Sequence, residues 1–499
     1  MTASPSTPVV IVGGGPTGIT AAILLALQGV PSLVIERWED IYPQPRAVHL
    51  DDEVYRILGK LGVADEFAAI SRPALGLQII DSDHQVLARF QRDPNNEPNG
   101  YPQANLFDQP DLERILRNRL AELPLATLRS GAEVISLTRQ PDTDEITVDV
   151  RDMSTGAVDQ INTCFVLGCD GANSLVRTAI GSTMEDLHFE QHWLVIDVDT
   201  EAELEQWGGV HQLSDKRAGT YMRIGPTRHR WEFQLLPGED ATDFENLDQL
   251  LPLIKPWTGS VDGSQLNIVR CAGYTFRAQI ADSWRSGGVF LLGDAAHLTP
   301  PFIGQGMGAG LRDAYNLAWK LSAVLHGCRR PEEVLDSYQA ERRPHALALI
   351  RNAVLIGFAM TGGGIAGQLF RAAALPRVSR MPGLGRAATT SETPRLHKSE
   401  LISRRRHPRA LEGRLCPNAR IDQQLRVDDV GTLYAVITVD DLEPDDLQYW
   451  TAFPARIVRV DIDSTLGRWL KRGRSRAALI RPDSIVRTTA ENAAQLRPS

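Results

Sequence analysis

Cysteine is scarce in this sequence of 499 residues, and its distribution forms no recognisable framework. There are five cysteines, an odd number, and none of them belongs to a C-x-x-C pair. An odd, scattered set argues against a disulfide framework, and the missing pairs argue against a zinc site. We therefore expect reduced thiols, a cytoplasmic location and no bound metal.

An excess of positive charge is missing as well. The chain has 53 Lys and Arg residues against 62 Asp and Glu residues, which gives a net charge of -9. Because nucleic-acid-binding proteins usually present a basic face, we expect no nucleic-acid partner and no binding to anionic membranes. The first predicted strand begins by residue 9, so we also expect no signal peptide before it.

One uncharged run needs to be tested against a membrane-spanning helix. No charged residue occurs from Asn352 to Phe370, and a spanning helix needs about 20 mainly apolar residues. Gly362-Gly-Gly364 interrupts this run, and Thr361 and Gln368 make it more polar. We expect two short helices packed on the body of the protein and no stable membrane insertion.

A short apolar strand and three glycines organise the N-terminal region. Residues 9–12 are followed by the motif Gly13-x-Gly15-x-x-Gly18 and by a helix rich in Ala and Leu. In such a motif the glycines allow a tight turn, the close approach of a pyrophosphate and close packing of helix on strand. The helix N-terminus offers free N–H groups to the phosphates. A second strand ends at Glu36, where an acid can bind a ribose hydroxyl, so the sequence predicts a dinucleotide site.

Two later segments also place polar residues directly after a buried strand. Residues 165–168 are followed by Asp170-Gly171 and a helix that presents Arg177, and residues 288–292 are followed by Gly293-Asp294. Ligands of open α/β sheets bind at the carboxyl ends of the strands. We expect both segments at the cofactor, with Asp294 on a ribityl hydroxyl unless it only caps a helix, and with His297 as a core residue.

A glycine-rich loop, Gly304-Gln305-Gly306, then leads into a long helix. Its free N–H groups would stabilise the negative charge of a reduced flavin. Between the second and third signatures, residues 187–271 alternate in the manner of an antiparallel sheet with Gly, Pro and Asp turns. We expect an FAD-binding domain over residues 1–186 and 276–395, a substrate domain over 187–275 and a C-terminal domain over 396–499.

The three ordered signatures together resemble the single-component flavoprotein aromatic hydroxylases, which share the fold of 4-hydroxybenzoate hydroxylase. The phrases most similar to the 3-(3-hydroxyphenyl)propionate hydroxylases are Pro45-Arg-Ala-Val-His-Leu-Asp-Asp-Glu, Trp193-Leu-Val-Ile-Asp, Phe233-Gln-Leu-Leu-Pro-Gly-Glu, Gly293-Asp-Ala-Ala-His and Arg312-Asp-Ala-Tyr-Asn-Leu-Ala-Trp-Lys-Leu. The implied fold is α/β: a Rossmann-like FAD-binding domain, an inserted antiparallel substrate sheet and a small thioredoxin-like C-terminal domain. That last domain lacks C-x-x-C, so we expect it to serve contacts in a homodimer or higher homo-oligomer rather than thiol chemistry.

The resemblance implies FAD as cofactor, with NADH or NADPH and O2 as co-substrates. The residues that it implies at the cofactor are Gly13, Gly15, Pro16, Thr17, Gly18, Glu36, Arg37, Arg46, Gln109, Asp170, Gly171, Arg177, Gly293, Asp294, Pro301, Gly304, Gln305, Gly306 and Met307. Pro300 and Pro301 would wall a dry substrate pocket. The candidate substrate contacts are His211, Tyr221, Arg223 and Phe233, although each fits a packing role as well.

The predicted activity is hydroxylation of a small phenol, similar to 3-(3-hydroxyphenyl)propionate, through a flavin C4a-hydroperoxide. No protein nucleophile is needed, so none is assigned. One alternative keeps the cofactor and acts on a polyketide or other natural-product scaffold by hydroxylation, epoxidation or Baeyer–Villiger oxidation. A remote alternative is a non-catalytic binding protein of the same fold, such as the Rab GDP-dissociation inhibitors. Halogenation is disfavoured because no W-x-W-x-I-P segment is present.

Overall fold

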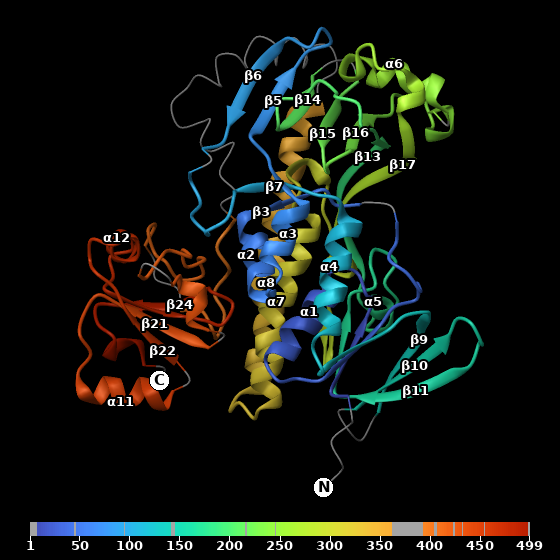
Figure 1. Cartoon of the computed structure of the whole chain (residues 1–499). Helices are drawn as coiled ribbons and strands as arrows, with labels where there is room; N and C mark the ends of the chain where they lie inside the picture. The colour runs from blue at the N-terminus through green and yellow to red at the C-terminus, as the bar shows by residue number, and fades with distance from the viewer. Residues whose placement is uncertain are drawn as a thin grey trace.

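The structure is a computed structural model, which has three parts (Figure 1). A domain built on a parallel sheet lies in the middle, a large, mainly antiparallel sheet lies at one end, and a small C-terminal domain lies at the side. This arrangement confirms the expected α/β class. The described residues are 7–43, 46–93, 95–140, 145–214, 217–244, 246–361, 393–403, 407–422, 425–431, 433–453 and 455–497.

The middle domain is built on a six-stranded sheet with the order β18-β19-β12-β1-β2-β8. All neighbouring strands are parallel except β18 and β19. β1 is buried along its whole length, as the apolar run predicts for a strand covered on both faces. The strands are β1 (Val9–Val12), β2 (Ser32–Ile35), β8 (Ala126–Arg129), β12 (Phe165–Gly168), β18 (Arg285–Ser286) and β19 (Val289–Leu291).

Helices cover one side of this sheet and a second, small sheet packs on the side away from them (Figure 1). The helices of this layer are α1 (Pro16–Leu27), α4 (Gln109–Ala121) and α7 (Gly306–Leu325). The small sheet contains β9 (Ala132–Arg139), β10 (Ile146–Asp152) and β11 (Val158–Thr163), with α5 (Leu175–Ala179) beside it. α1 and α7 approach closely because Gly293 and Gly310 meet at Thr17, where a Cβ on Gly310 would lie 2.3 Å from the Thr17 hydroxyl.

The large sheet has eight strands in the order β20-β17-β13-β16-β15-β14-β5-β6. It extends the range expected for the substrate domain, because β5 and β6 join it from the N-terminal part of the chain. α6 (Leu247–Thr258) covers one of its faces. The strands are β5 (Gly76–Ile80), β6 (Val86–Gln91), β13 (Met184–Asp199), β14 (Val210–Leu213), β15 (Gly219–Arg223), β16 (Arg228–Gln234), β17 (Asn267–Ala281) and β20 (His297–Leu298).

A connecting layer joins the large sheet to the middle domain. It consists of the three-stranded sheet β3-β7-β4 with α2 and α3. One apolar cluster at this junction contains Val48 and Leu106 of the connecting layer and Met222 of the large sheet. The elements are β3 (His49–Asp51), β4 (Arg72–Pro73), β7 (Ala104–Leu106), α2 (Asp52–Leu61) and α3 (Ala64–Ile70).

α8 is one helix of 31 residues, Pro331–Thr361. The expected division into two short helices is therefore not found within it, and Gly362-Gly-Gly364 lies outside the described residues. By length and composition alone, α8 contains an 18-residue window apolar enough to cross a membrane, and 33% of that window is buried in the protein. α8 packs on α7 and on β17, and Glu341 and Arg342 are buried within it.

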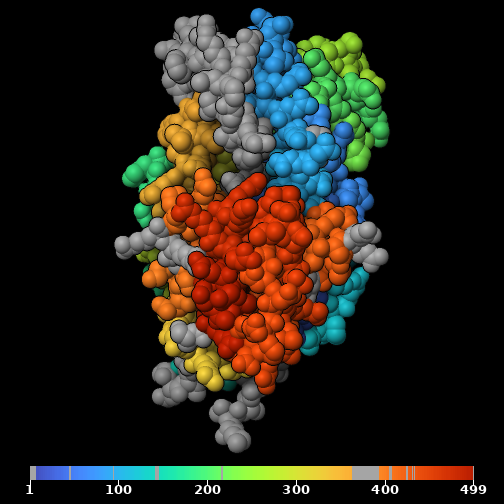
Figure 2. Space-filling model, turned by 90° about the vertical axis from the view of Figure 1, so that its left-hand side faces the viewer, coloured from blue at the N-terminus to red at the C-terminus, as the bar shows by residue number. Residues whose placement is uncertain are grey.

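The described residues of the C-terminal domain form a mixed four-stranded sheet, β22-β21-β23-β24, and two helices. β21 and β22 are parallel, and the other pairs are antiparallel. Figure 2 shows its residues, in orange and red, covering the middle of one face of the molecule. The elements are β21 (Tyr434–Thr438), β22 (Ala455–Arg459), β23 (Ala477–Ile480), β24 (Val486–Ala490), α11 (Pro444–Ala452) and α12 (Thr465–Arg472).

Buried charges attach this domain to α7 and α8. Glu341 accepts hydrogen bonds from both terminal nitrogens of Arg481, at 2.8 and 2.9 Å, and from Lys320 at 2.9 Å. The side chains of all three residues are fully buried. Burial alone would raise the pKa of Glu341, but Arg481 and Lys320 hold that pKa below its usual value.

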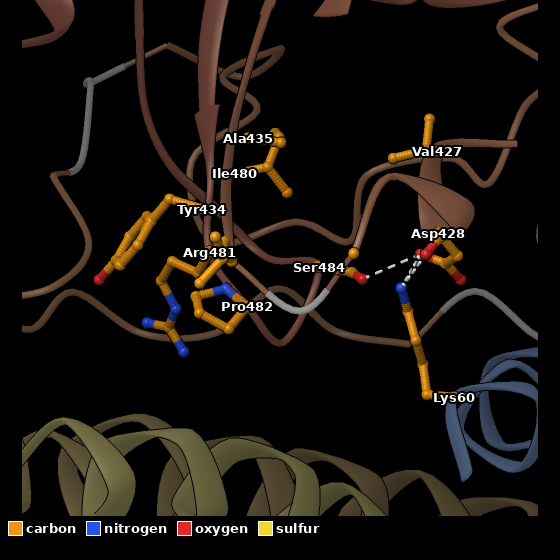
Figure 3. Close-up of a pocket in the computed structure, with 11 residues that line it drawn as sticks. Lys60, Val427, Asp428, Tyr434, Ala435, Ile480, Arg481, Pro482 and Ser484 are labelled. Carbon is orange, nitrogen blue, oxygen red and sulfur yellow. Dashed lines mark hydrogen bonds and ion pairs between the residues drawn. The ribbon is translucent and has the colours of Figure 1, made fainter. Parts of the chain in front are cut away.

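A second ionic contact attaches the same domain to α2. Asp428 pairs with Arg56 through both carboxylate oxygens and lies 3.3 Å from the Lys60 amine. Figure 3 shows Lys60 reaching from α2 toward Asp428, with Ser484 donating to Asp428 from the other side at 3.3 Å. The pocket between them is lined by these groups and by Arg481 and Pro482 of the C-terminal domain. Because its polar groups serve the domain contact, we assign no separate ligand to it.

Candidate functional site

The three sequence signatures meet at one edge of the parallel sheet. β1, β12 and β19 are parallel neighbours, so the residues that follow them lie side by side. The backbone continues this pairing beyond the strands: the N–H of Cys169 donates to Val12 at 2.8 Å, and the N–H of Leu292 donates to Gly168 at 2.9 Å. The distances between the signatures along the sequence do not show this convergence. It was anticipated only from the rule that ligands of open α/β sheets bind at the carboxyl ends of the strands.

The turn between β1 and α1 has the geometry that the glycine motif predicts. Gly13 has φ +104°, and a Cβ there would lie 2.3 Å from the carbonyl oxygen of Cys169. A Cβ on Gly18 would lie 2.0 Å from the carbonyl oxygen of Gly13. Gly15 differs, because no protein atom lies within 4 Å of the corresponding position. The first and third glycines are thus required by the protein itself, whereas the second faces free space at the N-terminus of α1.

Glu36 lies at the end of β2, beside this turn. Its Oε2 accepts a hydrogen bond of 2.6 Å from the N–H of Gly14, and its Oε1 accepts one of 2.9 Å from Trp38. The carboxylate is therefore held in place beside the glycine turn and retains lone pairs for a ribose hydroxyl. Arg37 is exposed, and its guanidinium lies 5.4 Å from the centroid of the Trp38 ring.

The Asp170-Gly171 turn follows β12 and is tied to the turn after β19. Asp170 accepts a hydrogen bond of 2.6 Å from the hydroxyl of Ser174, which caps α5. Arg177 donates to the carbonyl oxygen of Ala295 at 3.0 Å. These residues hold two strand-end turns in a fixed relation.

Gly293 is fixed from behind by a buried ionic group. The N–H of Gly293 donates to Asp313 Oδ2 at 3.1 Å, and His297 Nε2 lies 2.8 Å from the same oxygen. Arg342 donates to Asp313 Oδ1 at 2.8 Å. Burial would raise the pKa of Asp313, but the charges of Arg342 and His297 hold it below its usual value. His297 is fully buried, in agreement with the expected core role.

Asp294 is exposed at the same edge, unlike the neighbouring Gly293 and Ala295. Loss of water around its carboxyl raises its pKa, and the charges of His297 and Arg46 act in the opposite direction. An accessible carboxylate surrounded by protein on several sides can accept hydrogen bonds from the hydroxyl groups of a bound ligand.

The loop from Pro300 to Met307 ends the site on the side of α7. Pro301–Ile303 forms a short 3-10 helix, η4, and Gly306 begins α7. In this loop Gln305 is fixed by Asp51, which accepts a hydrogen bond of 2.7 Å from it and one of 2.6 Å from Arg312. Reasoning from sequence missed this buried group, because its members are some 260 residues apart.

His49 was missed for the same reason. A Cβ on Gly304 would lie 2.5 Å from its Nδ1, so this ring packs directly against the glycine loop. Burial, and the nearby charge of Arg92, lower the pKa of His49 to about 4, while Asp51 acts to raise it. The ring is therefore neutral at pH 7.

Arg46 and Gln109, both expected along FAD, lie together, and the side chain of Gln109 is used within the protein. Its Oε1 accepts hydrogen bonds from the N–H groups of Arg46 and Ala47, at 3.2 and 2.6 Å. The Arg46 side chain is exposed, and its carbonyl oxygen accepts a hydrogen bond of 3.1 Å from Arg230 of the large sheet. Pro45, which precedes it, lies outside the described residues.

The four residues expected to contact substrate share one face of the large sheet. Cross-strand pairing places His211 beside Tyr221, and Tyr221 beside Trp231. These side chains, with Phe233, are buried beneath α6, and the Trp257 indole donates to His211 at 2.9 Å. Arg223 follows Tyr221 by two residues on β15, so it lies on the same face, at the edge of this group. We call it the α6 face, and its residues form a packed core there.

The opposite face, which we call the inner face, is directed to the middle domain. On it, the ring of Trp193 lies 5.8 Å from that of Phe302 in η4, and Arg230 reaches the carbonyl oxygen of Arg46. The sequence pattern identified the alternation correctly but could not indicate which face meets the cofactor domain.

The residues present fit an adenine dinucleotide that carries a flavin. In the described part of the chain, no side chain caps the N-terminus of α1 or of α7, so both offer free N–H groups to a ligand. Free space at Gly15, the anchored Glu36 and the accessible Asp294 lie along the same sheet edge. Fold and site together define a dinucleotide-binding flavoprotein with a large, mainly antiparallel sheet beside the candidate site.

The chain belongs to the FAD binding domain family, which matches residues 6–353. It is similar to a probable NADH-specific resorcinol 4-hydroxylase of Rhodococcus jostii, with 36% identity over 71% of this chain and 65% of that protein. It is also 32% identical to a 3-(3-hydroxy-phenyl)propionate/3-hydroxycinnamic acid hydroxylase of Burkholderia cenocepacia, over 96% of this chain and 93% of the relative. A solved structure of aklavinone-11 hydroxylase with FAD and aklavinone matches with TM-score 0.81 and 25% identity, over 99% and 98% of the two chains.

Proposed function

We propose that this chain is an FAD-dependent monooxygenase that uses NADH or NADPH and O2 to hydroxylate a small phenol. The single observation that carries this proposal is that three strand-end turns and two uncapped helix N-termini converge at one sheet edge. The inner face of the large sheet is directed toward this edge. The names of the relatives in Rhodococcus and Burkholderia support a resorcinol-like or 3-(3-hydroxyphenyl)propionate-like substrate. We further propose a cytoplasmic enzyme without stable membrane insertion.

In this proposal the residues of the glycine turn hold the FAD pyrophosphate at the N-terminus of α1, and Glu36 binds the ribose. Asp294 binds the ribityl chain, and the N–H groups at Gly306 and Met307 stabilise negative charge on the flavin ring. When bound, FAD supplies hydride acceptance from the nicotinamide and activation of O2. Pro300 and Pro301 exclude water from the space between loop and sheet.

Gln109 and Asp51 act in this proposal by positioning other groups. Gln109 holds the backbone at Arg46, and Asp51 holds Gln305 at the start of α7. We infer that substrate lies on the inner face of the large sheet rather than on the α6 face, since only the inner face is directed to η4 and to Arg46.

The experiment is NADH and NADPH oxidation by the FAD-loaded protein, with peroxide, O2 uptake and product followed together. The panel contains resorcinol, 3-(3-hydroxyphenyl)propionate and aklavinone. Oxidation stimulated by one of the small phenols, with a hydroxylated product and little peroxide, is the expected result. Rapid oxidation that yields only peroxide with every compound would refute a hydroxylase.

A second candidate keeps the cofactor and takes a polyketide scaffold. The observation that favours it is the match, over nearly the whole chain, to a hydroxylase solved with aklavinone. Stimulation and product formation with aklavinone alone would support this candidate against the small-phenol one.

A further inference from the structure

Two carboxylates of the inner face, Asp199 and Glu232, accept no hydrogen bond from the described residues, and Glu232 is the one nearer to Trp193 and η4. Glu232 lies on β16, between Val195 of β13 and Thr220 of β15. Its neighbour Asp197 is fully committed, because Arg230 donates to both of its oxygens at 2.7 and 2.8 Å. The Arg230 guanidinium lies 3.8 Å from Glu232, beyond hydrogen-bond distance.

Glu232 also lies between the two points where the inner face meets the cofactor domain. One row along the strands is Trp193, whose ring contacts that of Phe302 in η4. One row in the other direction is Arg230, which binds the carbonyl oxygen of Arg46. The carboxylate thus lies on the part of the inner face between the contact with η4 and the contact with the Arg46 backbone.

Side chains of this part of the sheet remain accessible to solvent. The inner-face side chains around Glu232 are partly exposed, whereas the α6 face is closed. We call them the open strip: Thr220, Glu232, Gln234, Ala272 and Tyr274. The Glu232 side chain is 14% exposed. Buried Val195 and Trp193 provide an apolar floor beside the strip, suited to an aromatic ring.

We propose that Glu232 accepts the hydrogen bond of the substrate's phenolic hydroxyl and takes its proton during hydroxylation. This inference rests on the proposed function. The substrate O–H bond breaks, an O–H bond forms on the carboxylate, and the electron pair stays on the phenolate oxygen. The phenolate donates that electron density to the ring carbons ortho and para to it, which is where an electrophilic oxygen adds. No electron passes to or from the protein in this step.

The environment suits a carboxylate with this role. Burial raises the pKa of Glu232, an effect that Arg230 and Arg270 oppose and Asp197 reinforces. A carboxylate of raised pKa is a better proton acceptor, because general-base efficiency rises as the pKa approaches the working pH.

The test compares wild type with Glu232→Gln, Glu232→Asp and the control Glu190→Gln, all loaded with FAD. Glu190 is an exposed glutamate on β13 of the same sheet and pairs only with surface groups in the described structure. Binding of resorcinol and of 1,3-dimethoxybenzene is measured from the perturbation of the visible flavin spectrum. Product and peroxide are measured with resorcinol, or with whichever panel phenol the wild type hydroxylates, and its methyl ether.

In wild type the phenol should bind about 10-fold to 100-fold more tightly than its methyl ether, because the ether leaves the carboxylate unpaired. Glu232→Gln should lose most of this discrimination, since an amide can donate to an ether oxygen. Its product formation should fall about 100-fold or more, with unchanged FAD content. Glu232→Asp should keep the preference for the phenol and recover part of the rate.

Equal discrimination and equal product formation in wild type and Glu232→Gln would overturn the assignment while leaving the hydroxylase function intact. If no phenol on the panel stimulates the wild type, the proposed function fails and this inference fails with it. A uniform loss of FAD from Glu232→Gln and Glu232→Asp, but not from Glu190→Gln, would show a structural role and overturn the proposal as well.

Discussion

Glu341 fixes the C-terminal domain to the helices of the middle domain, and we predict that Glu341→Gln loosens this attachment. Five hydrogen bonds converge on the carboxylate, from Arg481, Lys320, Asn316 and Ser399, at 2.6 to 2.9 Å. Glutamine keeps the shape, but it has no charge and turns an N–H donor toward two buried cations. Removing one partner of a buried ion pair costs about 3–5 kcal/mol.

The lower end of that range applies here, because Arg481 keeps its second partner, Asp483. A loss of about 3 kcal/mol raises the population of molecules with an undocked C-terminal domain about 100-fold. The assay is native-state proteolysis, in which the rate of cleavage follows the open population when opening and closing are fast. We expect the C-terminal domain to be cleaved about 100-fold faster in Glu341→Gln than in wild type.

The matched control is Glu333→Gln on the same helix. Glu333 pairs with Arg330 at 3.2 Å, with side chains 46% and 68% exposed, and exposed pairs contribute about 0–1 kcal/mol. Equal cleavage rates for the two variants would refute the reasoning. The pH dependence gives a second check: the folded pKa of Glu341 is below its unfolded value of 4.5. In wild type, the contribution of ionised Glu341 to the stability of the docked domain is therefore complete above about pH 4.5 and declines below that pH. Glu341→Gln should lack this decline.

Three further predictions concern the site and the large sheet. Gly18→Ala should destabilise the protein, since its Cβ would lie 2.0 Å from the Gly13 carbonyl oxygen. Gly15→Ala should leave the melting temperature of the apoprotein unchanged and weaken FAD binding, because its Cβ would enter free space. Equal FAD retention after gel filtration in Gly15→Ala and wild type would contradict the second expectation. Asp294→Asn should lower FAD affinity, measured by flavin fluorescence, and an unchanged dissociation constant would exclude its role on the ribityl chain. Burial lowers the pKa of His229 from 6.5 to about 4. The contribution of the neutral ring to the free energy of unfolding is therefore complete above pH 6.5 and is lost progressively toward pH 4, by about 3 kcal/mol. His229→Asn should flatten the pH dependence of the unfolding free energy over that interval, and a slope equal to that of wild type would count against this prediction.

The local elements of the site were predictable because short-range chemistry determines them. A buried β-branched strand, a glycine turn and an apolar helix are adjacent in sequence, so the β1-turn-α1 unit follows from residues 9–27 alone. The same holds for α4, which begins at Gln109 as its Pro and first-turn acid indicate, and for α7 after Gly304–Gly306. The carboxyl-end rule then placed Asp170 and Asp294 at one sheet edge.

The sequence by itself determined these elements, the cofactor class and the alternation of the large sheet, since each depends on neighbouring residues. Only the tertiary structure decided which face of that sheet meets the cofactor domain. A period-2 pattern of apolar residues is the same whichever face is turned inward, so His211 and Tyr221 could be placed on one face, but that face could not be assigned to α6. The partners of Asp51 and Glu341 likewise depend on contacts between segments hundreds of residues apart, which no local pattern records.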